Sequence, residues 1–273
     1  MALFIGPNLD PDEQRIPIAE AIGLMEGYRN FEDREKWHFV ANLLHRSHGE
    51  VEFLEAHIKR LFENEEYDKI SDGYRSNSLA LPGSESFRVR INRWRPVGTR
   101  PIDNYVDIGL SYGIAHNHDF QLITKGIFGD GYRTKVFKIK SDACAGAVGE
   151  PTKLHPQGEF QLCDQSVIWF EAFEDIHIQI PPDDESISFN LIPTERNFEK
   201  PQLFFDTTSS TVSGFPENSF GSTLSYLDLM ASLNSSQEVS ELLVEIAMSS
   251  RSRWFRTCVA SILSRRLGME YAE

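Results

Sequence analysis

The feature that most constrains the fold is a series of short β-type runs from residue 87 onward, with no helical pattern between them. Some of these runs alternate apolar and polar residues, and others are rich in Ile, Val, Phe and Trp. The runs are "FRVRINRW", "NYVDIGLSYGIAHNH", "YRTKVFKIK", "SVIWFEAF", "IHIQI" and "SISFNLI". Their separators, "GDG", "GAVGEPTKLHPQGE" and "PPDDE", are typical of turns. Six or more such strands predict an antiparallel sandwich or barrel.

The two flanks of this β region have helical periodicity instead. Apolar residues recur at helical spacing over residues 12–70, which predicts a helical hairpin, and the turn-rich stretch 71–86 closes it. Residues 207–223 are rich in Ser, Thr and Gly, and the amphipathic segment 240–267 follows them.

The expected class is therefore α+β, in three parts. Residues 1–86 form an N-terminal helical region, residues 87–206 form the barrel, and residues 207–273 form a linker with helices that pack on the barrel. The C-terminal helical segment is also a candidate surface for a homodimer.

Charge and cysteine content exclude several classes of function. The chain has 273 residues and a formal net charge of −14, which opposes binding to nucleic-acid phosphates. No apolar run approaches the roughly 20 residues that span a bilayer, and the N-terminus has no secretory pattern. Three cysteines, far apart and odd in number, suit a reducing compartment. We expect a cytoplasmic protein with no nucleic-acid or membrane partner.

The segment "GIAHNHDFQLITKG" contains two histidines at strand spacing. Residues i and i+2 of a strand share a face, so His116 and His118 are placed to share one metal ion at about 2.1 Å from each nitrogen. A third candidate is His177 in "DIHIQI", which lies on the face opposite three isoleucines and is expected to face a polar barrel interior. The alternative is that these are ordinary hydrogen-bonded histidines.

This pattern resembles the cupin superfamily. "HNH" and Gly126 match the core of the first cupin motif, where the glycine occupies a turn, and the segment around His177 resembles the second motif. Two features depart from the family. First, the glutamate position of the first motif has no acidic residue in this chain, and the nearest polar residue, Gln121, falls on the opposite strand face from His118. Second, "FEDIH" lacks the proline and glycine that usually precede the last histidine.

The resemblance covers residues 87–206 and implies an antiparallel β-barrel, the double-stranded β-helix, with a metal inside it. Three histidines without a carboxylate resemble the thiol dioxygenase branch, in which Fe(II) keeps positions open for substrate and O2. Imidazole ligands alone do not choose the metal, so Zn, Ni or Mn remain alternatives to iron.

An arginine on an early strand is a candidate for substrate binding. Arg88, Arg90 and Asn92 share one face of "FRVRINRW". The resemblance assigns Arg90 to a substrate carboxylate, which a guanidinium binds with two hydrogen bonds. The alternative is a solvated edge whose charge discourages aggregation.

Tyr132 is the second candidate catalytic residue. Together with Tyr105 and Tyr112 it flanks the histidines in sequence, and a phenol beside a metal can donate a hydrogen bond or a proton to bound oxygen. The simpler explanation for each of the three is a packed residue whose hydroxyl reaches a local partner. Cys163, near the second motif, is expected to be a buried small hydrophobe.

The N-terminal histidines offer a competing metal site. Glu35 and His38 have the spacing that places two ligands on one helix face, but a bundle site needs a second such pair, which the sequence lacks. His45 and His48 precede Gly49 at an expected helix end, where histidine interacts with terminal carbonyls.

The leading hypothesis is a non-haem Fe(II) oxygenase acting on a small polar or amino-acid-like molecule with O2. A non-redox metal cupin, such as an isomerase or lyase, is the first alternative. The second is a regulatory cupin that binds a small ligand without turnover.

Overall fold

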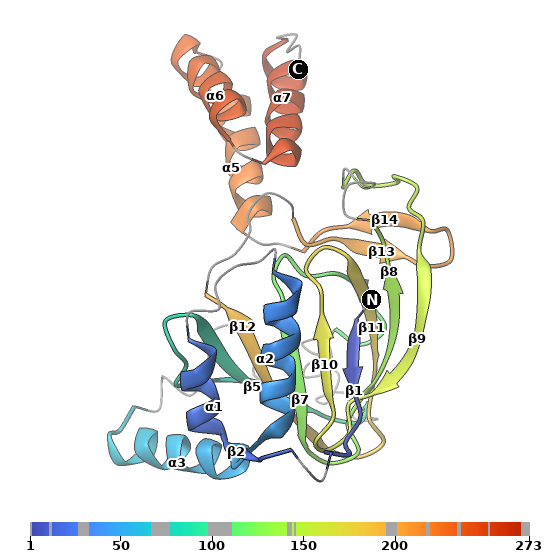
Figure 1. Cartoon of the computed structure of the whole chain (residues 1–273). Helices are drawn as coiled ribbons and strands as arrows, with labels where there is room; N and C mark the ends of the chain where they lie inside the picture. The colour runs from blue at the N-terminus through green and yellow to red at the C-terminus, as the bar shows by residue number, and fades with distance from the viewer. Residues whose placement is uncertain are drawn as a thin grey trace. The chain divides into compact units, whose positions relative to one another are not determined.

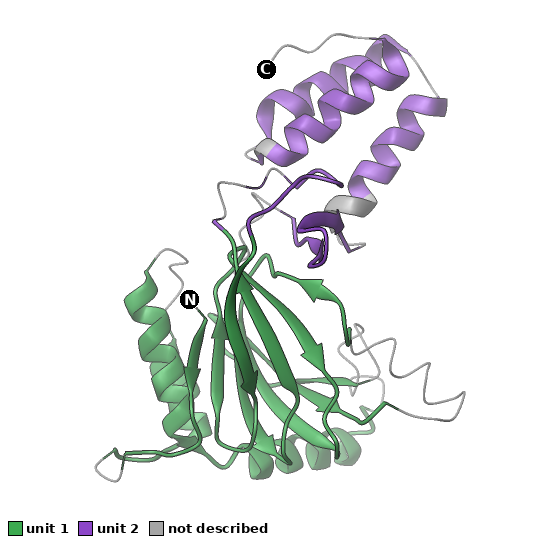
Figure 2. Ribbon diagram, turned by 90° about the vertical axis from the view of Figure 1, so that its right-hand side faces the viewer, with its two compact units in different colours: residues 1–139, 154–196 green, residues 140–153, 197–273 purple. Residues whose placement is uncertain are grey.

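The structure is a computed structural model in which residues 2–10, 13–26, 33–66, 77–97, 111–140, 144, 146–194, 201–216, 219–233, 236–250 and 252–268 are described. The chain divides into two compact units (Figure 2). Unit 1 comprises Met1–Ile139 and Leu154–Arg196, and unit 2 comprises Lys140–Lys153 and Asn197–Glu273. The N-terminal helices thus belong to the same unit as the strands that carry the histidines.

The first sheet of unit 1 is antiparallel and six-stranded, in the order β1-β10-β7-β12-β5-β4 (Figure 1). Its strands are β1 (Leu3–Ile5), β4 (Ser78–Leu81), β5 (Phe87–Trp94), β7 (Leu122–Phe128), β10 (Val167–Phe170) and β12 (Ser186–Pro193). β1 and β4 lie before residue 87, where no strand was predicted. β4 is only four residues long within a turn-rich stretch, and it forms because it pairs with β5 at the sheet edge.

The second sheet of unit 1 contains four strands in the order β6-β11-β8-β9. They are β6 (Ala115–His116), β8 (Arg133–Lys138), β9 (His155–Gln161) and β11 (Asp175–Ile180). β9 was assigned to a turn because "HPQGEFQ" contains Pro and Gly. It is a strand at the edge of this order, where a missing N–H is tolerated.

The two large groups of strands in unit 1 form facing sheets, and no closed barrel is found among the described strands, in contrast to the prediction. "GIFGDGY" is not a hairpin turn, because β7 pairs with β10 and β12 whereas β8 pairs with β11 and β9. The link between β7 and β8 therefore passes from one sheet to the other. A Cβ on Gly131 would lie 1.6 Å from the Leu162 carbonyl oxygen, so this crossing requires glycine.

Gly126 lies inside β7 and not at the turn that the cupin comparison implied. A Cβ at this position would lie 2.1 Å from the Cys163 carbonyl oxygen. The glycine therefore permits close approach of two backbones and makes no turn. Cys163 itself is half-buried, so it is not the buried hydrophobe that was expected.

Helices cover the outer face of the first sheet (Figure 1). They are α1 (Ile18–Met25), α2 (Arg34–Arg46) and α3 (Glu50–Glu63), three helices where a hairpin was predicted. Two short parallel strands, β2 (Ile16–Pro17) and β3 (Ser47–His48), join the starts of α1 and α3. Alternation along β5 sends Phe87, Val89 and Ile91 into the core beneath the helices, where Trp37 of α2 meets Phe87 edge-on.

A second core fills the space between the two sheets. The first sheet contributes residues such as Leu122 and Phe170, and the other side contributes Tyr132 and Val136. This core positions the functional site, because it decides which face of each sheet points inward.

The described residues of unit 2 form a β-hairpin and three helices. They are β13 (Phe204–Asp206), β14 (Thr211–Gly214), α5 (Ser219–Leu233), α6 (Gln237–Ser249) and α7 (Arg253–Leu267). Ser236 and Ser252 accept hydrogen bonds from backbone N–H groups at the starts of α6 and α7. The inward residues of α5, α6 and α7 form a core of their own. The expectation that these helices pack on the strands of unit 1 stays a prediction. None of the described helices is long and apolar enough to cross a membrane.

Candidate metal centre

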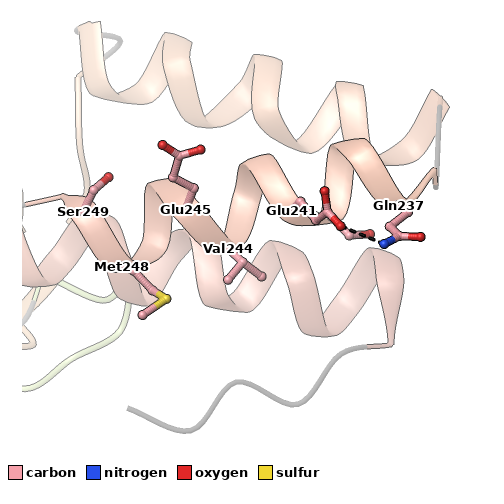
Figure 3. Close-up of a pocket in the computed structure, with 7 residues that line it drawn as sticks. Gln237, Glu241, Val244, Glu245, Met248 and Ser249 are labelled. Carbon is pink, nitrogen blue, oxygen red and sulfur yellow. Dashed lines mark hydrogen bonds between the residues drawn. The ribbon is translucent and has the colours of Figure 1, made fainter.

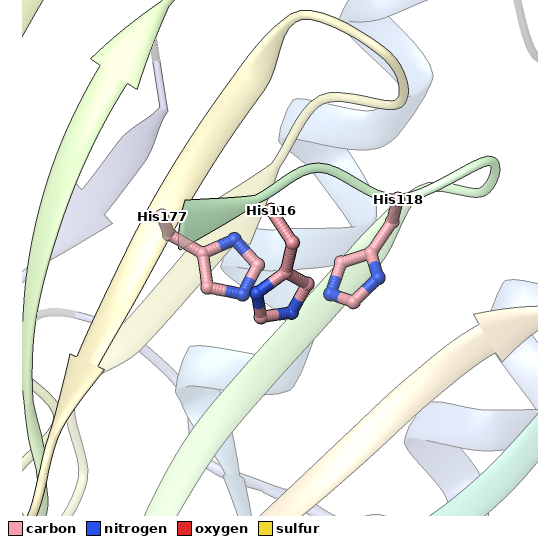
Figure 4. Close-up of side chains that lie close together, drawn as sticks. All are labelled: His116, His118 and His177. Carbon is pink, nitrogen blue, oxygen red and sulfur yellow. The ribbon is translucent and has the colours of Figure 1, made fainter. Parts of the chain in front are cut away.

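Strand pairing brings the three histidines together. His177 on β11 lies directly opposite His116 on the neighbouring antiparallel strand β6. His118 follows two residues later, and its ring lies 5.1 Å from that of His116 and 4.9 Å from that of His177 (Figure 4). One potential ligand atom from each residue lies within 4.8 Å of the other two.

The surroundings of the triad are aromatic, in contrast to the polar interior that was expected. Phe170 from the first sheet lies 4.4 Å from the ring of His177, and Phe120 stacks on His118 at 4.7 Å. His177 is fully buried, whereas His118 is half-exposed. The triad is thus closed by apolar rings on the inside and reaches solvent on the His118 side.

His116 and His177 differ in the hydrogen bonds that their ring nitrogens make. Nδ1 of His116 lies 2.9 Å from the Ile114 carbonyl oxygen, a contact in which Nδ1–H donates and Nε2 keeps its lone pair for a metal. Both ring nitrogens of His177 are buried and have no hydrogen-bond partner within the described parts of the chain. Buried polar groups are usually hydrogen-bonded, and a bound cation would give one of these two nitrogens a partner. The residues therefore fit a metal ion.

Electrostatics also favours neutral ligands. Burial lowers the pKa of His177 well below its usual value, and the neighbouring His116 and His118 lower this pKa further. A neutral imidazole is the form that coordinates a metal, so His177 needs no deprotonation near neutral pH.

We expect the metal-free protein to lose stability as the pH falls below 6.5. The pKa of His177 is lower in the folded chain than the ordinary value of 6.5, so the unfolded chain binds a proton that the folded chain does not. The stability present above pH 6.5 is lost as the pH falls toward the folded-state pKa. Urea unfolding across this range measures the slope.

His45 contributes to the same range, because burial also lowers its pKa. The informative comparison is therefore His177→Gln, which should show a shallower dependence of unfolding free energy on pH than the wild type. Equal slopes would contradict the assignment.

No carboxylate joins the triad among the described residues. Gln121, next to the position of the missing glutamate, faces elsewhere: its Oε1 accepts hydrogen bonds from Trp169 Nε1 at 2.7 Å and from the Ala172 N–H at 3.3 Å.

The alternative metal site on the N-terminal helices is not formed among the described residues, because His38 packs edge-on against Trp169 and belongs to no cluster of potential ligands. His45 contacts the Gly6 carbonyl oxygen through Nε2 at 2.8 Å.

Arg90 lies on the face of β5 that points between the sheets, since its neighbours Val89 and Ile91 face the helices. It is half-buried, and its register partner is Asn190, whose Nδ2 donates to the Arg90 carbonyl oxygen at 3.0 Å. The structure thus places Arg90 on the same side of the first sheet as Phe170, which contacts the triad. Its role toward substrate stays a prediction.

Tyr132 is fully buried against Trp94, with ring centroids 4.3 Å apart. Burial raises the pKa of its phenol, and the Gln179 side chain opposes this rise in part. Gln179 shares a strand face with His177, so the hydroxyl lies in the layer next to the triad. Tyr112 donates its hydroxyl proton to the Arg95 carbonyl oxygen at 2.9 Å, and Tyr105 lies outside the described residues.

The residues that sequence reasoning missed are Phe120 and Phe170. The i, i+2 spacing that relates His116 to His118 continues to Phe120. The sequence pattern therefore could have predicted that Phe120 lies beside the histidines. Phe170 had no local signal, because its contact with His177 depends on how the two sheets face each other.

Comparison with known proteins adds distant structural matches only. No model of a known protein family matches the sequence, and no curated protein is similar to it. Among solved structures, a cupin 2 domain-containing protein from Halorhodospira halophila is 12% identical with a TM-score of 0.29, covering 50% of this chain and 73% of that one.

Two further matches have names that describe different reactions. Hydroquinone 1,2-dioxygenase from Sphingomonas sp. TTNP3 is 8% identical with a TM-score of 0.29, covering 47% of this chain and 71% of that one. A sugar phosphate isomerase of the cupin superfamily from Silicibacter pomeroyi is 10% identical with a TM-score of 0.27, covering 56% and 88%. Function must therefore be argued from the site itself.

Proposed function

We propose that this chain is a metal-dependent cupin-type enzyme, and specifically a non-haem Fe(II) oxygenase that uses O2 on a small polar or amino-acid-like substrate. The observation that carries the proposal is the cluster of buried His116 and His177 with half-exposed His118, which no carboxylate of the described residues joins. Three protein ligands leave coordination positions open, which distinguishes a catalytic from a structural site. When bound, the metal would supply open positions for O2 and substrate and would mediate electron transfer from the substrate, which is oxidised, to O2.

The rest of the chemistry is assigned to side chains of the chain. Phe120 and Phe170 exclude water from the inner side of the histidines, so substrate is expected to approach from the half-exposed His118 side. Arg90 would orient a substrate anion from the facing sheet. Tyr132, whose raised pKa keeps the phenol protonated, would donate a hydrogen bond.

The donor set also favours a second candidate. Three imidazoles hold zinc in catalytic sites as readily as iron, and in that case the metal acts as a Lewis acid in an isomerase or lyase reaction. Ni and Mn would serve the same role. This candidate differs from the first in a measurable way, since it consumes no O2.

Metal loading and oxygen uptake test the proposal together. Protein purified without O2 should retain about one metal ion per chain by elemental analysis. The iron-loaded form should then consume O2 with at least one member of a panel of amino-acid-like thiols and carboxylates, and the zinc-loaded form should not. Turnover of a substrate without O2 uptake by the zinc or nickel form would favour the second candidate. Failure to retain any added metal would overturn both.

A further inference from the structure

Helix α5 in unit 2 has two apolar faces, and only one of them is used by its own unit. Leu224, Leu227 and Ala231, at positions i, i+3 and i+7, point into the core shared with α6 and α7. Tyr226, Leu229 and Leu233 have the same spacing, but they are 71%, 50% and 78% exposed. A helix that is apolar on both sides is normally buried on both sides.

The outward face, which we call the α5 stripe (Tyr226, Leu229 and Leu233), lies among neutral residues. Ser225 and Ser232 are its exposed neighbours, and the only charged residue between Ser219 and Leu233 is Asp228. Asp228 is already paired within the unit, because Arg265 and Arg266 of α7 each donate to its carboxylate at 2.9 Å. These two arginines lower the pKa of Asp228 to about 2, the Arg266 contact being the stronger cause.

We infer that the α5 stripe is a dimer interface and that its occupant is the α5 stripe of a second copy of this chain. The spacing of the stripe suits antiparallel pairing about a two-fold axis: with Leu229 at the axis, Tyr226 of each copy lies against Leu233 of the other. Such pairing buries no charge. A neutral contact is the one on which two copies of a chain with net charge −14 repel least.

The exposed face of α6 is the competing surface, and its charges argue against self-association. It combines Val244 and Met248 with Glu241 and Glu245, and these residues line an open hollow of about 670 Å³ (Figure 3). Pairing this face with itself would bring like charges together. The α6 face is therefore less suited to self-association than the α5 stripe.

The contact is short, so the dimer should be weak. Only three side chains from each copy take part, and stable interfaces usually involve many more, so we expect a weak and concentration-dependent dimer. Because the two copies carry the same net charge, added salt should strengthen the dimer by screening their repulsion.

Analytical ultracentrifugation of the full chain tests this inference. The wild type should show a concentration-dependent dimer, and Leu233→Glu should weaken it at least about tenfold, since the two-fold axis introduces the charge twice. The matched control is Met248→Glu, which places a charge on a side chain that is 71% exposed but lies on α6. It should dimerise like the wild type, and circular dichroism should show that both variants retain their helices.

A crosslink tests the geometry independently. Leu229→Cys should form a disulfide-linked dimer under mild oxidation beyond the wild-type background, because only a residue near the axis meets its own copy. Leu242→Cys, on α6, should not. A wild type that stays monomeric at all concentrations would overturn the inference, as would loss of the dimer in Met248→Glu with retention in Leu233→Glu. The latter would identify the α6 face as the interface.

Discussion

Replacing His177 by alanine is expected to abolish tight metal binding. His177 is fully buried, lies opposite His116 on the neighbouring strand and has two unpartnered ring nitrogens within the described structure. Loss of a hydrogen-bond partner behind a ligand typically lowers metal affinity about 10- to 100-fold. Loss of the ligand itself should exceed that range. Competition with a chromogenic chelator measures the affinity.

The matched control for this loss is His155→Ala. His155 is exposed on β9 and belongs to no cluster of potential ligands among the described residues. This variant should keep the affinity of the wild type. Equal affinities for wild type and His177→Ala, in folded protein, would remove the basis of the proposed function.

His116 and His118 should differ from each other in their effect on folding. His116 is buried and donates to the Ile114 carbonyl oxygen, so its removal also leaves a backbone acceptor without its side-chain partner. His118 is half-exposed. His118→Ala should therefore lower metal affinity with a smaller effect on the free energy of unfolding than His116→Ala.

Replacing Lys125 by methionine is expected to destabilise the fold by about 3–5 kcal/mol. Lys125 lies on β7 and is fully buried beneath the helices. Its Nζ donates to the Ser47 carbonyl oxygen at 2.6 Å and to Glu50 Oε1 at 2.8 Å. Without the cation, the Glu50 carboxylate would stay buried and uncompensated, and this causes the loss. Urea denaturation measures it.

A double variant distinguishes the missing charge from the missing side chain. Lys125→Met combined with Glu50→Leu removes both charges and should cost less than the sum of the two single changes, with a coupling of about 0.5–3 kcal/mol. Burial lowers the pKa of Lys125, and Glu50 opposes this, which is consistent with a cation held by its partner.

The surface pair Lys59–Glu63 provides the control. Its atoms are 3.7 Å apart on α3, and both side chains are more than 60% exposed. Lys59→Met should change the unfolding free energy by less than about 1 kcal/mol. If Lys125→Met is equally mild, the buried pair does not anchor the helices to the sheet.

Local pattern was enough to predict several strands and part of the site. The alternation in "FRVRINRW" corresponds to β5, and the period of two placed His116 and His118 within reach of each other. The same period placed Arg88, Arg90 and Asn92 on one face of this strand, but the structure was needed to show that Val89 and Ile91 face the core beneath the helices. These inferences need only the geometry of one strand and its immediate neighbours.

Other features had no local signature. β4 and β9 are strands because each has a partner at a sheet edge, although their Ser, Pro and Gly content is typical of turns. Likewise, position 126 requires glycine because the backbone of Cys163 lies directly beside it. No sequence pattern around residue 126 indicates this contact.

By itself, the sequence determined the β-rich centre, the helical flanks and the closeness of His116 and His118. The expectation that both histidines lie on one strand was only partly right, because β6 ends at His116 and His118 follows it. Only the tertiary structure decided that the strands form two facing sheets, that His177 lies opposite His116, and that aromatic rings close the cluster. The physical reason is that side-chain alternation is a property of a single strand. Register and sheet membership depend instead on hydrogen bonds and packing between segments far apart in the chain, which are settled only when the whole core assembles.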